Sequence, residues 1–398
     1  MRLLSTIFLI FFTLFFSLFV EARFLIRPSD QAVFHNNRGV TYLNQGDIEN
    51  ALFEFKMAVQ LAPEYAEGYN NLGLTYKFKE QYDLAIDALR KAIQYNKDYA
   101  AAYTHLGTIY YTLGKYDDAI SQFHRAIKAN KKYGDAYYNL GLTYKTLAIK
   151  NRRNTTYTDA LNAFRNALAA SPNHYLANIE MGNIYRQLDK NEEAIMHYKA
   201  ALEVQPSSPE GWKNLGVLYL QKGDVSKAQF AFNKALEADP DSAEAHAGLA
   251  TYYLKTNNLT LARQELDIAQ RLDPNHELVR FDKAYLDLLT GNYSQAVQGF
   301  EGVVSKNPIY VDALYNLAYA HGQLGHYPQA VQYYEKTLQL KPGFAPALLN
   351  LGMLKLQHGD KKSGLSLLCQ FLKKVPPELA HTENTVRNTI TQNNGKCN

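Results

Sequence analysis

Residues 209–242 read PEGWKNLGVLYLQKGDVSKAQFAFNKALEADPDS, and this stretch decides the fold. Large apolar residues recur three and four places from small ones in both halves, a spacing typical of paired helices. Lys222-Gly223-Asp224 lies between the halves and is a turn signal, because it ends one helix and starts another. Pro240 stops the second helix and sets the bend into the next unit. The stretch therefore predicts one helix–turn–helix unit.

The unit recurs along almost the whole chain of 398 residues, which is longer than a single compact core. A small residue marks each unit, and every interval between these residues is 34 positions except one of 41: Gly39, Gly73, Gly107, Gly141, Gly182, Gly216, Ala250, Ala284, Ala318 and Gly352. We expect ten repeats, at 32–65, 66–99, 100–133, 134–174, 175–208, 209–242, 243–276, 277–310, 311–344 and 345–378.

The repeat resembles the tetratricopeptide repeat family. The sixth unit matches the family signature at Trp212, Leu215, Gly216, Tyr219, Ala228, Phe232, Ala235 and Pro240, and the resemblance covers residues 32–378. It implies an all-α fold, a right-handed superhelix (an α-solenoid) of about ten repeats. It also implies that the first helix of each pair lines a concave face. The last repeat departs most from the pattern and is expected to act as a solvating cap.

The sixth position of each unit falls on the expected concave face. Asparagine occupies it in six of ten units, at Asn37, Asn71, Asn139, Asn214, Asn316 and Asn350. A carboxamide both donates and accepts, so such a row suits the backbone of an extended peptide. The row resembles the asparagine ladder in the repeat domain of O-linked N-acetylglucosamine transferases, whose catalytic domain has no counterpart here. The alternative interpretation is local bonding between adjacent helices.

Aromatic side chains add apolar area to the same expected face, at Tyr138, Phe281, Tyr285, Tyr315 and Tyr319. Tyrosine suits a partner-binding groove because it offers a large contact area at little entropic cost. Helix–helix packing is the alternative. Asp287, His321 and Lys355 replace the usual tyrosine at the eleventh position of units eight to ten. An acidic row, which would prefer a basic partner or simply be solvated, follows at Glu67, Asp135, Glu210, Glu244 and Asp312.

The first residues predict export. Arg2 precedes an apolar run at residues 3–20, which resembles a secretory signal cleaved after Ala22 and is also long enough for an uncleaved membrane anchor. Residues 1–22 form this segment, and residues 23–31 lead into the first repeat. We therefore expect a periplasmic, luminal or extracellular protein, with membrane contact only through this segment. Cys369 and Cys397 are the only cysteines, and free thiols are expected in preference to a bridge.

Three further features fall outside the repeat pattern. The fourth unit carries seven extra residues within 146–158, which extend its helices or form a loop. Asn154, Asn258 and Asn292 begin glycosylation sequons in turns between helices. The polar tail at residues 379–398 contains Leu379, Val386 and Ile390, whose spacing fits one more short helix.

The sequence offers no catalytic or cofactor chemistry. It has no phosphate-binding glycine loop and no metal-ligand spacing of histidine or cysteine, and its net charge of +4 comes without a basic run for nucleic acid. We predict a non-enzymatic scaffold or adaptor, without cofactor, that holds an extended segment of another protein. The alternatives are a self-assembling structural protein and the substrate-presenting partner of a separate glycosyltransferase.

Overall fold

A computed structural model describes residues 28–151 and 154–397. The apolar segment at residues 3–20 lies outside the described residues, so the expected signal or anchor is untested. None of the described helices has both the length and the apolar character that crossing a membrane requires. The chain divides at Val204–Gln205 into two compact units, each made of five repeats.

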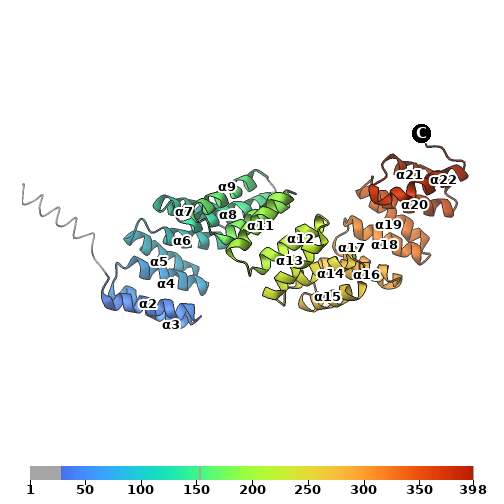
Figure 1. Ribbon diagram of the computed structural model, residues 1–398. Coiled ribbons are helices and arrows are strands. Elements are labelled where there is room, and N and C mark those ends of the chain that lie inside the picture. Colours follow the sequence, from blue (N-terminus) through green and yellow to red (C-terminus); the bar gives the residue numbers. More distant parts are fainter. Residues whose placement is uncertain (1–27, 152–153, 398) are drawn as a thin grey trace, which may run out of the picture. The chain divides into compact units, whose positions relative to one another are not determined.

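The first unit consists of five antiparallel helix pairs (Figure 1). The first helices of the pairs are α2 (Asp30–Asn44), α4 (Ala66–Phe78), α6 (Ala100–Thr112), α8 (Gly134–Asn151) and α10 (Tyr175–Gln187). The second helices are α3 (Ile48–Leu61), α5 (Tyr82–Tyr95), α7 (Tyr116–Ala129), α9 (Asn154–Ala170) and α11 (Asn191–Val204).

The second unit continues the same pattern with five more pairs and two short terminal helices. Its first helices are α12 (Pro209–Gln221), α14 (Ala243–Lys255), α16 (Glu277–Leu289), α18 (Val311–Gln323) and α20 (Ala345–Gln357). Its second helices are α13 (Val225–Ala238), α15 (Leu259–Leu272), α17 (Tyr293–Lys306), α19 (Tyr327–Leu340) and α21 (Lys361–Lys373), followed by η1 (Pro377–Thr382) and α22 (Glu383–Gln392). The prediction of an all-α tandem-repeat fold is confirmed.

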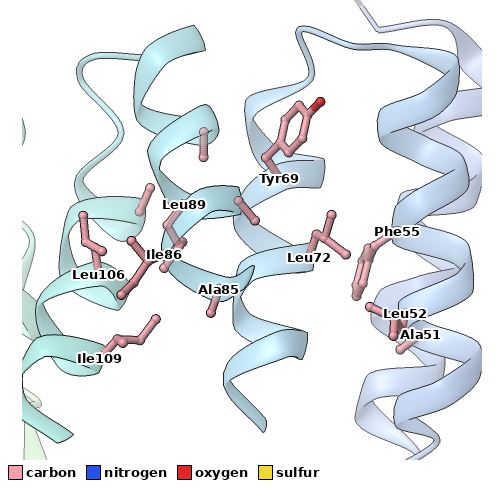
Figure 2. Packing of buried hydrophobic residues seen from close by; sticks show 13 residues of the cluster. Ala51, Leu52, Phe55, Tyr69, Leu72, Ala85, Ile86, Leu89, Leu106 and Ile109 are labelled. Atoms are coloured by element: carbon pink, nitrogen blue, oxygen red, sulfur yellow. The ribbon is translucent and has the colours of Figure 1, made fainter. Parts of the chain in front are cut away.

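The marker residue is glycine in seven of the ten repeats, and this glycine has a steric role. A Cβ added to Gly107 would lie 2.5 Å from Cε1 of Phe123, which is closer than real Cβ contacts come. The missing side chain therefore lets the aromatic ring of the second helix lie directly against the backbone of the first. Figure 2 shows the packing between neighbouring pairs, where Phe55 of α3 and Leu72 of α4 share one apolar cluster with Leu89 of α5.

Successive first helices lie closer to one another than successive second helices do. In the first unit α2 contacts α4, α4 contacts α6 and α6 contacts α8, while in the second α12, α14, α16 and α18 contact in succession. Neighbouring second helices make no contact of similar extent within residues 28–151 and 154–397. We call the surface of the first helices in each unit its inner face.

The insertion in the fourth repeat lengthens both of its helices. α8 has 18 residues and α9 has 17, whereas most first helices have 13 and most second helices have 14. Of the two outcomes expected from the sequence, the structure shows helix extension on both sides of residues 152–153.

The C-terminal tail folds back on the last repeat. α22 buries Val386 and Ile390 against Leu368 and Phe371 of α21. The expectation that the last repeat itself is the solvating cap is therefore wrong, because α22 covers its apolar side. The expectation of free thiols is also wrong: the fold-back brings the chain end to α21, where Cys397 forms a disulfide with Cys369.

Candidate partner-binding face

The sixth-position side chains of the first unit take part in a chain of hydrogen bonds. Nδ1 of His105 lies 2.9 Å from Oδ1 of Asn70, and because an amide oxygen only accepts, this nitrogen is the donor. Nδ2 of Asn70 donates to Asn71 at 3.3 Å, and Nδ2 of Asn71 donates to Oδ1 of Asn36 at 2.9 Å. Nδ2 of Asn36 then reaches a carboxylate oxygen of Glu67 at 3.4 Å.

This chain connects three consecutive repeats. Asn71 and His105 occupy the sixth position, and each bonds the fifth-position residue of the preceding repeat. Burial, together with the nearby charge of Lys77, lowers the pKa of His105 to about 4, so its ring is neutral at physiological pH. At Asn71 and His105 the structure therefore shows local bonding between adjacent helices, the alternative interpretation of the asparagine row. The adjacent pairs Asn36-Asn37 and Asn70-Asn71 were the sequence signal for it.

The other sixth-position asparagines differ in what they contact. Asn37 is exposed, and Nδ2 of Asn139 donates to the backbone oxygen of Asp135 in its own helix at 2.7 Å. Nδ2 of Asn350 lies 3.0 Å from the hydroxyl of Tyr315 and 3.4 Å from that of Tyr334. Asn214 and Asn316 are buried on α12 and α18. Asn37, Asn71 and Asn139 lie in the first unit, and Asn214, Asn316 and Asn350 lie in the second.

Replacing Asn71 by alanine is expected to lower the free energy of unfolding by about 1–3 kcal/mol, because the buried Oδ1 of Asn36 and Nδ2 of Asn70 each lose their hydrogen bond to Asn71. Replacing Asn37, the exposed neighbour of Asn36, is expected to change it by less than about 0.5 kcal/mol. Thermal unfolding and hydrogen exchange of α2 and α4 would measure both. Equal effects of the two variants would show that the hydrogen-bond chain adds no stability.

The predicted aromatic residues are partly buried and join the packing between repeats. The ring of Tyr138 lies 4.7 Å from that of His174, the last residue of the same repeat, which directly precedes α10. Phe281 stacks on Tyr310 at 5.1 Å, and Tyr315 packs edge-on against Phe344 at 5.3 Å. These three fifth-position rings thus contact the residue that precedes the next first helix.

Within the second unit, four of the predicted aromatic residues lie close to one another. Phe281, Tyr285 and Tyr319 pack on one apolar cluster, and Tyr315 and Tyr319 pack on the next. Each keeps part of its surface accessible on the inner face of α16 and α18. Whether a partner uses that surface stays a prediction.

Ion pairs and ring stacking replace the tyrosine lost at the eleventh position. Asp287 lies 3.4 Å from a guanidinium nitrogen of Arg263 on the preceding second helix, and Nζ of Lys355 lies 2.8 Å from a carboxylate oxygen of Glu335. His321 stacks on Tyr333 at 5.6 Å. The departures from the consensus in repeats eight to ten are therefore accommodated by local contacts.

Sequence reasoning missed a recurrent contact of the fourth position in the second unit. Nε1 of Trp212 donates to the backbone oxygen of Pro206 at 2.8 Å. Nε2 of His246 forms a hydrogen bond with the backbone oxygen of Pro240 at 3.0 Å, and Arg280 donates to the backbone oxygen of Pro274 at 3.2 Å. A donor side chain thus satisfies the carbonyl of the closing proline in three consecutive repeats.

Family models match the chain along its length. A model described as TPR repeat matches residues 39–77, 79–114, 107–147 and 182–223, and models described as tetratricopeptide repeat match 213–277 and 311–344. Together these stretches span more than half of the chain. The chain belongs to the tetratricopeptide repeat (TPR) family. TPR proteins generally mediate protein–protein interactions as scaffolds, and no enzyme family is indicated.

Solved TPR structures resemble the chain to different extents. The APC/C hetero-tetramer Cut9–Hcn1 aligns over 92% of this chain and 96% of its own, with 12% identity and a TM-score of 0.52. A TPR protein from Parabacteroides merdae aligns over 65% and 99%, with 19% identity and a TM-score of 0.47. MamA aligns over 42% and 94%, with 28% identity and a TM-score of 0.35. The first of these supports the fold alone, and no curated protein matches the sequence significantly.

No group of three or more His, Cys, Asp or Glu side chains is placed to hold a metal ion in the part of the chain that the structure describes.

Proposed function

We propose that this TPR protein is a non-catalytic scaffold or adaptor that holds an extended segment of a partner protein on the inner faces of its repeats. The observation that carries the proposal is the regular presentation of polar and aromatic side chains by successive first helices. Asn37 and Asn139 offer amide groups in the first unit, and Phe281, Tyr285 and Tyr319 offer apolar area in the second. The inner face of the first unit therefore suits hydrogen bonding to a peptide backbone, and that of the second unit suits apolar contact.

We further propose that the scaffold works in an exported compartment, in the cell envelope or secretory pathway. Three observations support this location. The apolar run at residues 3–20 has the character of a signal or anchor. The Cys369–Cys397 disulfide belongs to an oxidising environment. Asn258 and Asn292 are exposed at the turns before α15 and α17, where sequons can accept a glycan, while the side chain of Asn154 lies outside the described set.

The two alternatives have less support. End-to-end assembly through the last repeat needs an apolar side for the next copy, and α22 already covers that side. Presentation of substrates to a separate glycosyltransferase rested on the asparagine ladder, and Asn71 and Asn350 are engaged in hydrogen bonds within the protein.

The test is cross-linking of the native, exported protein followed by identification of its partners, with wild type compared to the double variant Asn37→Ala, Asn139→Ala. Neither substitution removes a hydrogen bond between helices, so the fold is expected to stay intact. We expect partners captured through the first unit to be depleted about fivefold or more, which corresponds to the loss of a hydrogen bond of about 1 kcal/mol.

A matched control removes an asparagine from outside the inner face, Asn233→Ala on α13, and should leave capture unchanged. If the double variant retains every wild-type partner, the inner face of the first unit is not the working surface.

A further inference from the structure

An aromatic stack on the inner face of the second unit lies near three carboxylates, those of Asp312, Asp282 and Glu277. Phe281 of α16 and Tyr310, which precedes α18, stack with centroids 5.1 Å apart and ring planes 23° apart. Burial, together with the nearby charges of Asp312, Asp282 and Glu277, raises the pKa of the Tyr310 hydroxyl. Three negatively charged side chains therefore lie near one ring of the stack.

None of the three carboxylates forms an ion pair within residues 28–151 and 154–397. Glu277 and Asp312 are exposed, whereas Asp282 is only 4% exposed. Asp282 accepts one hydrogen bond, from the hydroxyl of Thr251 on α14 at 2.7 Å. Lys255 on α14 is the basic residue whose charge acts on Asp282, yet no ion pair forms among the described residues.

Folding does not require the charge of Asp282. Burying a carboxylate without a cation is unfavourable, and here burial raises the pKa of Asp282 to about 6. Asparagine occupies the equivalent sixth position in six of the ten repeats, and its amide oxygen could accept the same bond from Thr251. An aspartate at this position therefore costs stability that an asparagine would not.

Helix electrostatics explain part of the cluster. Glu277 and Asp312 lie in the first turns of α16 and α18, where a carboxylate is stabilised by the helix dipole. Asp282 lies in the middle of α16, where this stabilisation is absent. Neither helix electrostatics nor an ion pair therefore accounts for an aspartate at position 282, next to Phe281 of the aromatic stack.

A cationic side chain is the group that this arrangement complements. Carboxylates attract an ammonium or guanidinium group, and an aromatic face adds a cation–π interaction. The low dielectric around Asp282 strengthens its attraction to a cation near the surface. Leu278, exposed on the same first turn of α16, offers apolar contact beside the charges.

We propose that the inner face of α14, α16 and α18, with Asp282 at its centre, binds a basic segment of the partner protein through a lysine or arginine placed against Phe281, Tyr310 and Asp312. This inference rests on the proposed scaffold function and specifies the chemistry of the partner. It concerns residues 243–323 of the second unit only.

The test uses the full-length protein and two labelled twelve-residue peptides, one alternating arginine with leucine and tyrosine, the other carrying glutamate in place of arginine. Fluorescence anisotropy should show binding of the basic peptide in clear preference to the acidic one. Asp282→Asn should weaken that binding about tenfold or more, as expected for loss of a charge-assisted interaction, and should leave the melting temperature unchanged or higher.

A matched control separates this site from general charge attraction. Glu301→Gln removes one exposed negative charge from α17 in the same repeat, and it should change affinity less than about twofold. Equal weakening by both variants would overturn the proposal. So would equal binding of the two peptides, which would nevertheless leave a peptide-binding scaffold intact.

The pH dependence gives an independent arm. Because Asp282 gains a proton as the pH falls through about 6, affinity for the basic peptide should be lower at pH 5 than at pH 7.5 in wild type. This difference should shrink in Asp282→Asn. A pH dependence that is identical in the two proteins would contradict a role for Asp282. If neither peptide binds, the inference is overturned, and the scaffold function is then tested by the cross-linking experiment alone.

Discussion

Truncating Phe232 to alanine is expected to lower the free energy of unfolding of the second unit by about 3–5 kcal/mol. The ring is fully buried on α13, where no solvent reaches it. It lies against two glycines of different repeats, since a Cβ on Gly216 would be 2.7 Å and one on Gly248 would be 2.2 Å from its Cε1. Its removal would leave a cavity between repeats six and seven. Denaturant unfolding and hydrogen exchange of α12–α14 would measure the loss.

The same helix provides the matched control. Phe230, two residues earlier, is 55% exposed; its ring is T-shaped to that of Trp212 and lies near the ammonium of Lys234. Phe230→Ala should therefore cost about 1 kcal/mol or less. Comparable losses for the two phenylalanines would contradict the packing described here.

Because the Phe232 ring lies so close to Gly248, adding a methyl group at Gly248 tests the same contact from the other side. Gly248→Ala should destabilise the second unit by about 1–3 kcal/mol through overpacking, although alanine is the better helix former. Combining it with Phe232→Leu should recover part of that loss, because the smaller side chain leaves room for the new methyl group. A strictly additive double variant would show that the two residues do not meet.

The repeat fold could be predicted because its determinants are local and recur in register. Gly107 admits the ring of Phe123, Gly114 adopts a positive φ in the turn that follows, and the interval of 34 residues repeats this arrangement. Each repeat contacts mainly its neighbours, so a short stretch of sequence contains most of the information for its own structure.

The partners of individual polar side chains could not be predicted in the same way. The sixth-position register places Asn71 on the inner face, but its hydrogen bond to Asn36 depends on the distance between two repeats. The register also does not indicate that Asp282 is buried beside Thr251, because the crossing of α14 and α16 determines its burial. Family consensus describes a position on the helix, whereas binding depends on what each neighbouring helix leaves accessible.

The C-terminal closure was missed for a related reason. Val386 and Ile390 suggested a short helix, yet nothing in the spacing of Cys369 and Cys397 indicates that this helix folds back onto α21. Once α22 packs on Leu368 and Phe371, the chain end arrives with the two Cα atoms 5.3 Å apart, within bonding range of a disulfide.

Removing this disulfide is expected to cost about 3–4 kcal/mol in the docking of α22, from the loop-closure entropy of cysteines separated by 28 residues. The variants are Cys369→Ser, Cys397→Ser and the two combined, compared with wild type before and after reduction. Hydrogen exchange of α22 should speed up by a factor of about a hundred or more, since each factor of ten corresponds to about 1.4 kcal/mol. Exchange of α2, in the other unit, is the internal control.

The single and double serine variants should behave alike, because each removes the same covalent link. Val386→Ala, which loosens the packing of α22 while the disulfide stays intact, should cost less than the cysteine substitutions, since the tether keeps the helix near its site. Exchange of α22 that is unaffected by reduction would mean that packing alone holds the tail. Alkylation of protein taken directly from its native compartment tests the proposed export. If both cysteines resist alkylation until a reductant is added, the folded scaffold lies in an oxidising environment. Immediate labelling of both cysteines would contradict the proposed export.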